Sequence, residues 1–260
     1  MKEKLKKLEN ELLELRKTAF VDCIMKKMEK DNIVGVFGEN IDEGLLYGYG
    51  LIPIPIIGLD SYIFDYGYTE GCDPIRSTMV YLETEKCPLL FSSKMYILDG
   101  SCPKIEEEFL RRTEKTVYKY NSKKDLDSLI KKEYGFEFSK KRFNEAEKYL
   151  KEIKSILEEV EESDFPSKEF FLLSFYTKYI IDLKKRKEFI ERVVEKFSFK
   201  KADKRKEIIA MCPGGIINNI NSNLEENHYK IVQNNKNADI TCCRCIYNAP
   251  TCFNYTRGGK

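Results

Sequence analysis

The strongest constraint on the fold is a regular alternation of strand-like and helix-like segments across the first half of the chain. Residues Ile33 to Phe37 are rich in β-branched side chains and end at Gly38, and a helix-like segment follows at 43–49. Residues 51–57 must be extended, because two prolines exclude a helix and restrict the residues before them. Further helices are expected at 74–83, 104–113 and 126–132, and further strands at 95–98 and 117–120. This alternation predicts an α/β fold with a mostly parallel sheet.

A helical section is expected to follow the sheet. Apolar residues repeat at spacings of three and four from Phe143 to Val160, which predicts a long amphipathic helix. Pro166 ends that pattern, and two more helices are expected over 167–181 and 184–197. The basic run Lys184–Lys187 is interpreted as a solvated helix face.

A second α/β unit is expected near the end of the chain. A strand at 207–211 leads through Cys212-Pro213-Gly214-Gly215 into a helix, and another strand is expected at 229–232. The unit has about two strands, so it is expected to be either a reduced domain or part of a longer reading frame. The expected divisions are an N-terminal α/β domain at 1–137, a helical section at 138–200 and a second, short or truncated α/β domain at 201–260.

The first residues carry leucines at alternating spacings of three and four, with lysines and glutamates between them. These leucines are Leu5, Leu8, Leu12 and Leu15. They predict an amphipathic helix of about two heptads that packs on a neighbouring element. Cys23 lies among apolar residues of the same segment and is expected to be a core thiol.

Charge and hydropathy exclude several classes of protein. Charged residues make up 34% of the chain and leave a net charge of +2, so no global field favours nucleic acid or an anionic membrane surface. The longest apolar stretch, Leu51 to Leu59, is far shorter than the roughly 20 residues that cross a bilayer. The charged N-terminus lacks the apolar core of a signal peptide, so a cytoplasmic location is expected. Nine cysteines are then thiols or metal ligands rather than disulfides.

Two of these cysteines lie in similar positions, each after an expected strand and directly before an expected helix. Cys72 follows Gly71 and precedes Asp73-Pro74, and Cys102 precedes Pro103. Free amides and the macrodipole at a helix N-terminus lower the pKa of a thiolate and stabilise an anionic group. The carboxyl ends of parallel strands are also where such folds bind ligands. The pair therefore predicts a metal cluster.

A set of motifs between Val34 and Tyr120 carries a resemblance to a known family. The motifs are Val34-Gly35-Val36-Phe37-Gly38, Asp42-Glu43, Gly50-Leu51-Ile52-Pro53, Cys72 with Arg76-Ser77, Cys102-Pro103 and Val117-Tyr118. In this stretch the chain resembles the subunits of 2-hydroxyacyl-CoA dehydratases and of the related benzoyl-CoA reductases. Pro103 replaces the aspartate that usually follows the second cysteine, and Ile41-Asp42-Glu43 replaces the more usual Pro-x-Glu.

The resemblance implies a radical enzyme with a [4Fe-4S] cluster, or a linked double cube, bound by Cys72 and Cys102. It implies that a separate ATP-dependent iron-sulfur activator supplies one electron to an acyl-CoA thioester, which then loses water. A homologous subunit or a second copy of the chain would complete a dimer. Arg76 and Ser77 would donate hydrogen bonds to a cluster sulfide or to the thioester. Glu43 would orient the turn after the first strand or act in catalysis.

A [4Fe-4S] cube needs more ligands than these two thiolates. The candidates for the remaining positions are Cys242, Cys243, Cys245 and Cys252, with Cys87, Cys212 or a partner subunit as alternatives. The C-x-x-C spacing of Cys242 and Cys245 also fits zinc, with Cys252 and Cys212 as further ligands. A noncatalytic iron-sulfur or zinc-binding interaction subunit, which has lost the substrate-binding domain, is the alternative to the enzyme.

Overall fold

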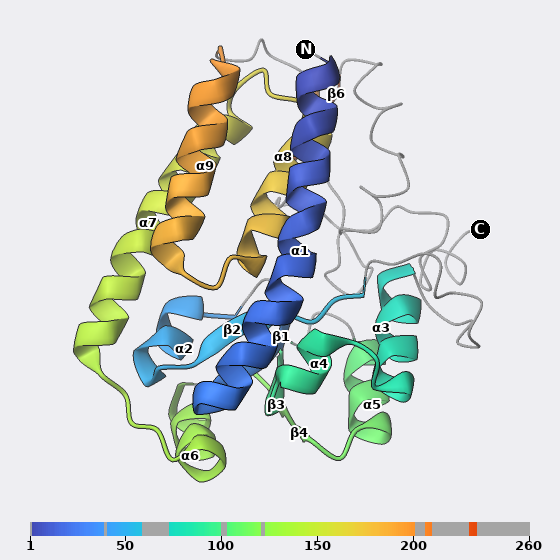
Figure 1. Ribbon diagram of the computed structural model, residues 1–260, viewed down its shortest axis with the longest axis vertical. Helices are drawn as coiled ribbons and strands as arrows, with labels where there is room; N and C mark the ends of the chain where they lie inside the picture. The colour runs from blue at the N-terminus through green and yellow to red at the C-terminus, as the bar shows by residue number, and fades with distance from the viewer. Residues whose placement is uncertain are drawn as a thin grey trace.

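The computed structural model describes residues 2–38, 41–58, 73–99, 103–120, 123–200, 206–209 and 229–232. This part of the chain is mostly helical and contains a four-stranded sheet in which every pair of neighbouring strands is parallel (Figure 1). The α/β fold expected from the sequence is therefore confirmed.

The sheet has the strand order β2-β1-β3-β4. Its strands are β1 (Ile33–Phe37), β2 (Ile52–Pro55), β3 (Met95–Leu98) and β4 (Thr116–Lys119). On the β2 edge, the amides of Ile52 and Ile56 donate to the carbonyls of Asn32 and Val36 at 2.9 and 3.1 Å. Pro53 and Pro55 occupy the alternate positions, so their nitrogens, which carry no hydrogen, point away from β1 to the side where no other strand of the described residues pairs with β2.

Two hydrophobic cores cover the two faces of the sheet, because successive strand residues point to opposite sides. Val34 and Val36 of β1 face α2 (Glu43–Tyr49) and α6 (Lys123–Tyr134). Ile33 and Phe37 face the other core. That core contains residues of α1 (Lys2–Lys30), α3 (Asp73–Thr84), α4 (Pro88–Ser92) and α5 (Pro103–Arg112), and it continues into the helical section described below. All five residues of β1 are buried, as is typical of a central parallel strand.

The helical section contains α7 (Lys140–Glu161), α8 (Ser167–Tyr176), the 3-10 helix η2 (Thr177–Tyr179) and α9 (Leu183–Phe197). Helix α1 runs from this section down to the sheet and contacts both α8 and α4 (Figure 1). Its buried residues Leu8, Leu12, Arg16, Ala19 and Cys23 continue the 3-4 spacing well past the two heptads expected from the leucines. The expected packing of this helix on a neighbour and the core position of Cys23 are both confirmed.

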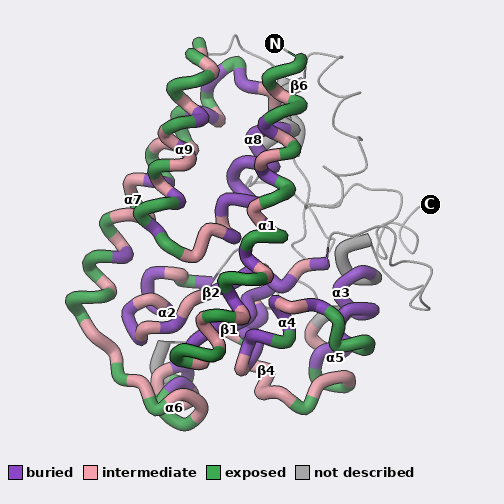
Figure 2. Tube along the Cα trace, viewed as in Figure 1, coloured by how far each residue is buried: buried purple, intermediate pink, exposed green. Residues whose placement is uncertain are grey.

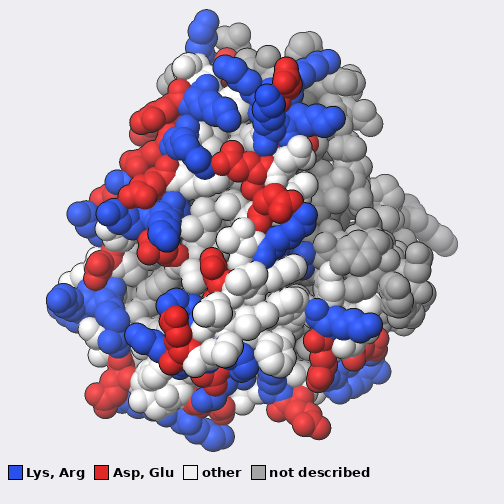
Figure 3. All heavy atoms as spheres, viewed as in Figure 1, with Lys and Arg blue, Asp and Glu red and all other residues white. Residues whose placement is uncertain are grey.

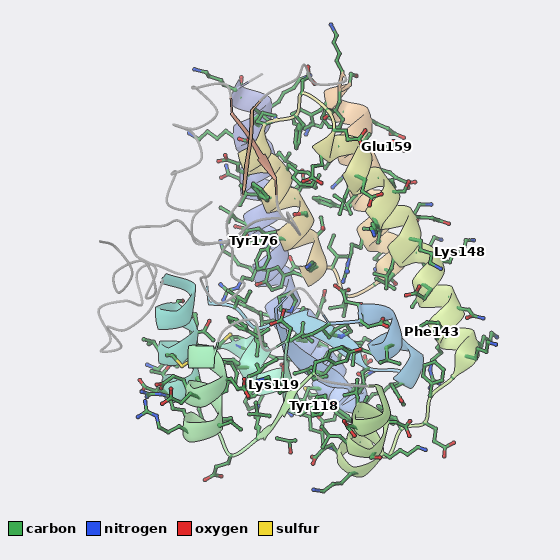
Figure 4. The ribbon with its side chains drawn as sticks, turned by 180° about the vertical axis from the view of Figure 1, so that it is seen from behind. Tyr118, Lys119, Phe143, Lys148, Glu159 and Tyr176 are labelled. Atoms are coloured by element: carbon green, nitrogen blue, oxygen red, sulfur yellow. The ribbon has the colours of Figure 1, made fainter. Side chains whose placement is uncertain are left out.

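Helices α2 and α7 pack closely through two glycines spaced four residues apart. A Cβ atom on Gly44 would fall 2.2 Å from Oε1 of Glu147, and one on Gly48 would fall 2.5 Å from the ring of Phe138. Phe143 of α7 lies beside α2 in Figure 4 and also closes on Gly48. The Glu147 side chain could move aside from a Cβ atom at position 44, so it is mainly the missing side chain at Gly48 that allows α2 to lie this close to Phe138 and Phe143.

The second α/β unit is described only as two parallel strands, β5 (Lys206–Ile209) and β6 (Tyr229–Val232). The expected helix between them lies outside the described residues. Strand β6 contacts α8, whose apolar side chains are buried, whereas many residues of α7 and α9 are exposed (Figure 2). Among the described residues, no helix combines the length and the apolar character needed to cross a membrane.

Candidate functional site

The chain changes direction across the sheet between β1 and β3. It passes from β1 to β2 on one side and then returns to β3 on the other, so a topological switch point lies at the carboxyl ends of β1 and β3. The amide of Asp99 donates to the carbonyl of Phe37 at 3.0 Å. Gly38 has a φ of 117°, and a Cβ atom there would fall 2.0 Å from Cγ of Asp99. A glycine at position 38 is required both by the backbone angle and by the carboxylate.

Two helices begin at this same edge. Helix α3 starts at Asp73, one residue after Cys72, and α5 starts at Pro103, one residue after Cys102. Each helix carries the chain from the carboxyl edge of the sheet back toward the amino edge, because every strand is parallel. The two helices therefore have their N-termini at one edge, in agreement with the sequence prediction. Cys72 and Cys102 themselves lie outside the described residues.

A charged cluster fixes α3 against α5. Glu108 of α5 is buried and accepts hydrogen bonds from Nη2 of Arg111 at 2.6 Å and from Nε of Arg112 at 2.5 Å. Arg112 also forms an ion pair with Glu83 of α3. This ion pair links the last turns of the two helices, so it holds their axes together at the end opposite the cysteines. The helices can then present their N-termini in a fixed relation.

The chain after β2 approaches the first half of α3 closely. The amide of Gly58 donates to Oγ1 of Thr78 at 2.8 Å, and Ser77 and Thr78 are fully buried. A Cβ atom on Gly58 would fall 2.5 Å from Oγ of Ser77 and 2.5 Å from the backbone nitrogen of Thr78. Ser77 thus lies at the contact between α3 and this segment. The side chain of Arg76 lies outside the described residues.

Alanine at position 58 is expected to destabilise the protein by about 1–3 kcal/mol, because its methyl group would overlap backbone atoms of α3 that cannot move independently of the helix. Chemical denaturation followed by circular dichroism measures this change. Gly135→Ala is the matched control, because a Cβ atom there meets nothing within 4 Å and only the φ of 68° is penalised. Equal stability of Gly58→Ala and the wild type would show that the approach of residue 58 to α3 is not close in solution.

Glu43 begins α2 and forms an ion pair in which it is half-buried and its partner is buried. Its Oε2 accepts a hydrogen bond from Nη1 of Arg186 at 2.8 Å. Burial raises the pKa of the Glu43 carboxyl, but the nearby charges of Arg186 and Lys178 outweigh burial and hold the pKa below its usual value. The preceding residue, Asp42, caps the helix by accepting from the amide of Leu45 at 2.8 Å. These contacts give both acidic residues of the Asp42-Glu43 motif a structural role in the turn after β1.

Arg186 is a residue that the sequence analysis missed. The interpretation of Lys184–Lys187 as a solvated face is wrong for Arg186, which is 3% exposed. Its Nε and Nη2 donate to the carbonyls of Ile180 and Lys178 at 3.1 and 3.2 Å. Burial opposes the positive charge, but Glu43 holds the pKa of the guanidinium above its ordinary value. One side chain therefore joins α9 and the segment before it to the first turn of α2.

The described cysteines are not arranged as ligands. Cys23 and Cys87 are buried in one hydrophobic core, and neither forms a disulfide bond. Burial, with smaller contributions from the charges of Asp22 and Cys87, raises the pKa of Cys23 to about 12, so this thiol stays protonated at neutral pH. Within the described ranges, no three residues among His, Cys, Asp and Glu gather as a metal site. Cys212, Cys242, Cys243, Cys245 and Cys252 lie outside those ranges.

Comparisons with known proteins add no assignment. No family model matches this chain, and no curated protein matches it significantly.

Proposed function

We propose that this protein binds a [4Fe-4S] cluster, or a linked double cube, at the carboxyl edge of its four-stranded sheet through Cys72 and Cys102. We further propose that it serves as a subunit of a radical dehydratase that removes water from a 2-hydroxyacyl-CoA thioester. One observation carries the proposal. Helices α3 and α5 begin one residue after each cysteine, pack on each other and start at the same edge of the sheet.

The donor set fits an iron-sulfur cluster. Iron in such clusters takes cysteine thiolates, and the first-turn amides of two neighbouring helices favour the negative charge of the thiolates and the sulfides. The helix starts of α3 and α5 provide two such sets of amides at one edge of the sheet. The remaining ligands would come from Cys242, Cys245, Cys252 or Cys212, or from a partner subunit.

The bound cluster would supply a low-potential one-electron step, with the electron delivered by an ATP-dependent activator protein. The described residues would hold the site in place for that step. Ser77 and Gly58 fix the first half of α3, Glu108 and Arg112 fix α5 beside it, and the Glu43–Arg186 pair holds α2 next to the same edge. Arg76 lies one turn into α3 and would donate to the thioester or to a sulfide.

Iron, sulfide and zinc analysis of the anaerobically purified protein tests this proposal. We expect a brown protein with a broad visible absorbance band that bleaches in air, and roughly four iron and four sulfide per cluster. A colourless protein with stoichiometric zinc, after anaerobic reconstitution has also failed, would exclude the cluster. That result would instead indicate a zinc-binding interaction subunit.

A further inference from the structure

No further inference is drawn: the strongest candidate, the exposed apolar surface that Val21, Met25 and Met28 of α1 form with Phe91 of α4 (Figure 3), carries none, because nothing in the part of the chain that the structure describes shows what covers it.

Discussion

Serine in place of Cys72 or of Cys102 is expected to remove most of the iron from the anaerobically purified protein. A hydroxyl is a harder and far less acidic ligand than a thiol, so it binds iron in a cluster poorly. In the proposed site, either change would remove one of the two thiolates that precede α3 and α5. Colorimetric iron and sulfide analysis, together with the visible absorbance, measures the loss.

The control for this experiment is a cysteine that the structure places away from the sheet edge. Cys23 is fully buried in α1, and its raised pKa of about 12 leaves almost no thiolate at neutral pH. Cys23→Ala should therefore keep its iron, although it creates a small cavity in the core. If all three variants hold the same amount of iron, Cys72 and Cys102 are not ligands and the proposed cluster site is wrong.

The sheet could be predicted from the sequence because its local signals agree with one another. The apolar run before Gly38 and the apolar run before Asp99 both became strands with the expected bounds, β1 and β3. The paired prolines after Leu51 excluded a helix, and they fit an edge strand because the missing amides face away from β1. Strand β4 and helix α6 differ from expectation only by one to three residues at their ends.

Features that depend on tertiary contacts could not be predicted in the same way. Helix α4 has five residues, which is too short for a periodic pattern. Its carboxyl end is capped by Lys115, whose Nζ donates to the carbonyls of Leu90 and Ser93 at 2.6 and 2.8 Å. That lysine is more than 20 residues away in the chain, so no local pattern predicts the cap.

The position of Arg186 on α9, rather than its charge, indicates that it is buried. Leu183, Ile190 and Val193 are buried, and Arg186 lies three residues after the first and four before the second. The spacing therefore places Arg186 on the apolar stripe of α9, and this signal was present in the sequence. Its partner Glu43 is 143 residues away, so the ion pair itself required the structure.

Contacts between residues far apart in the sequence likewise could not be predicted at the candidate site. The sequence placed both cysteines directly before helices, and the starts of α3 and α5 agree with that placement. It did not indicate that Gly58 and Ser77 would meet, because the two residues lie on different elements. The further cysteines that could complete the proposed cluster, apart from Cys87, lie after residue 209, where only β6 is described.

Leucine in place of Arg186 is expected to reduce the free energy of unfolding by about 3 kcal/mol at neutral pH. The change leaves the Glu43 carboxylate without its main partner, and it removes the hydrogen bonds that Arg186 donates to the carbonyls of Ile180 and Lys178. Removing one member of a buried ion pair costs about 3–5 kcal/mol, and the lower end applies because Glu43 remains 23% exposed to water. Chemical denaturation at several pH values measures the effect.

A second arginine on the same helix supplies the control. Arg192 pairs with Glu11 at 2.5 Å, but its side chain is 60% exposed. Surface pairs of this kind contribute about 0–1 kcal/mol, so Arg192→Leu should change stability little. A loss in Arg192→Leu equal to that in Arg186→Leu would show that burial of the guanidinium is not what makes Arg186 important.

The pH dependence of the free energy of unfolding tests whether Glu43 is the group that Arg186 stabilises. In the wild type the pKa of Glu43 lies below 4.5, so the stabilisation is present above that pH and is lost as the pH falls through the folded-state pKa. Without Arg186, burial outweighs the charge of Lys178 and should raise the pKa above 4.5. The folded variant then takes up a proton before the unfolded chain does, so its stability rises as the pH falls from 7 toward 5.

The difference in the free energy of unfolding between the wild type and Arg186→Leu should therefore shrink in acid. The double variant Glu43→Leu/Arg186→Leu lacks both charges, so its difference from the wild type should stay the same between pH 7 and pH 5. A difference of the same size at pH 5 and pH 7 would mean that Arg186 stabilises the protein through its carbonyl contacts alone.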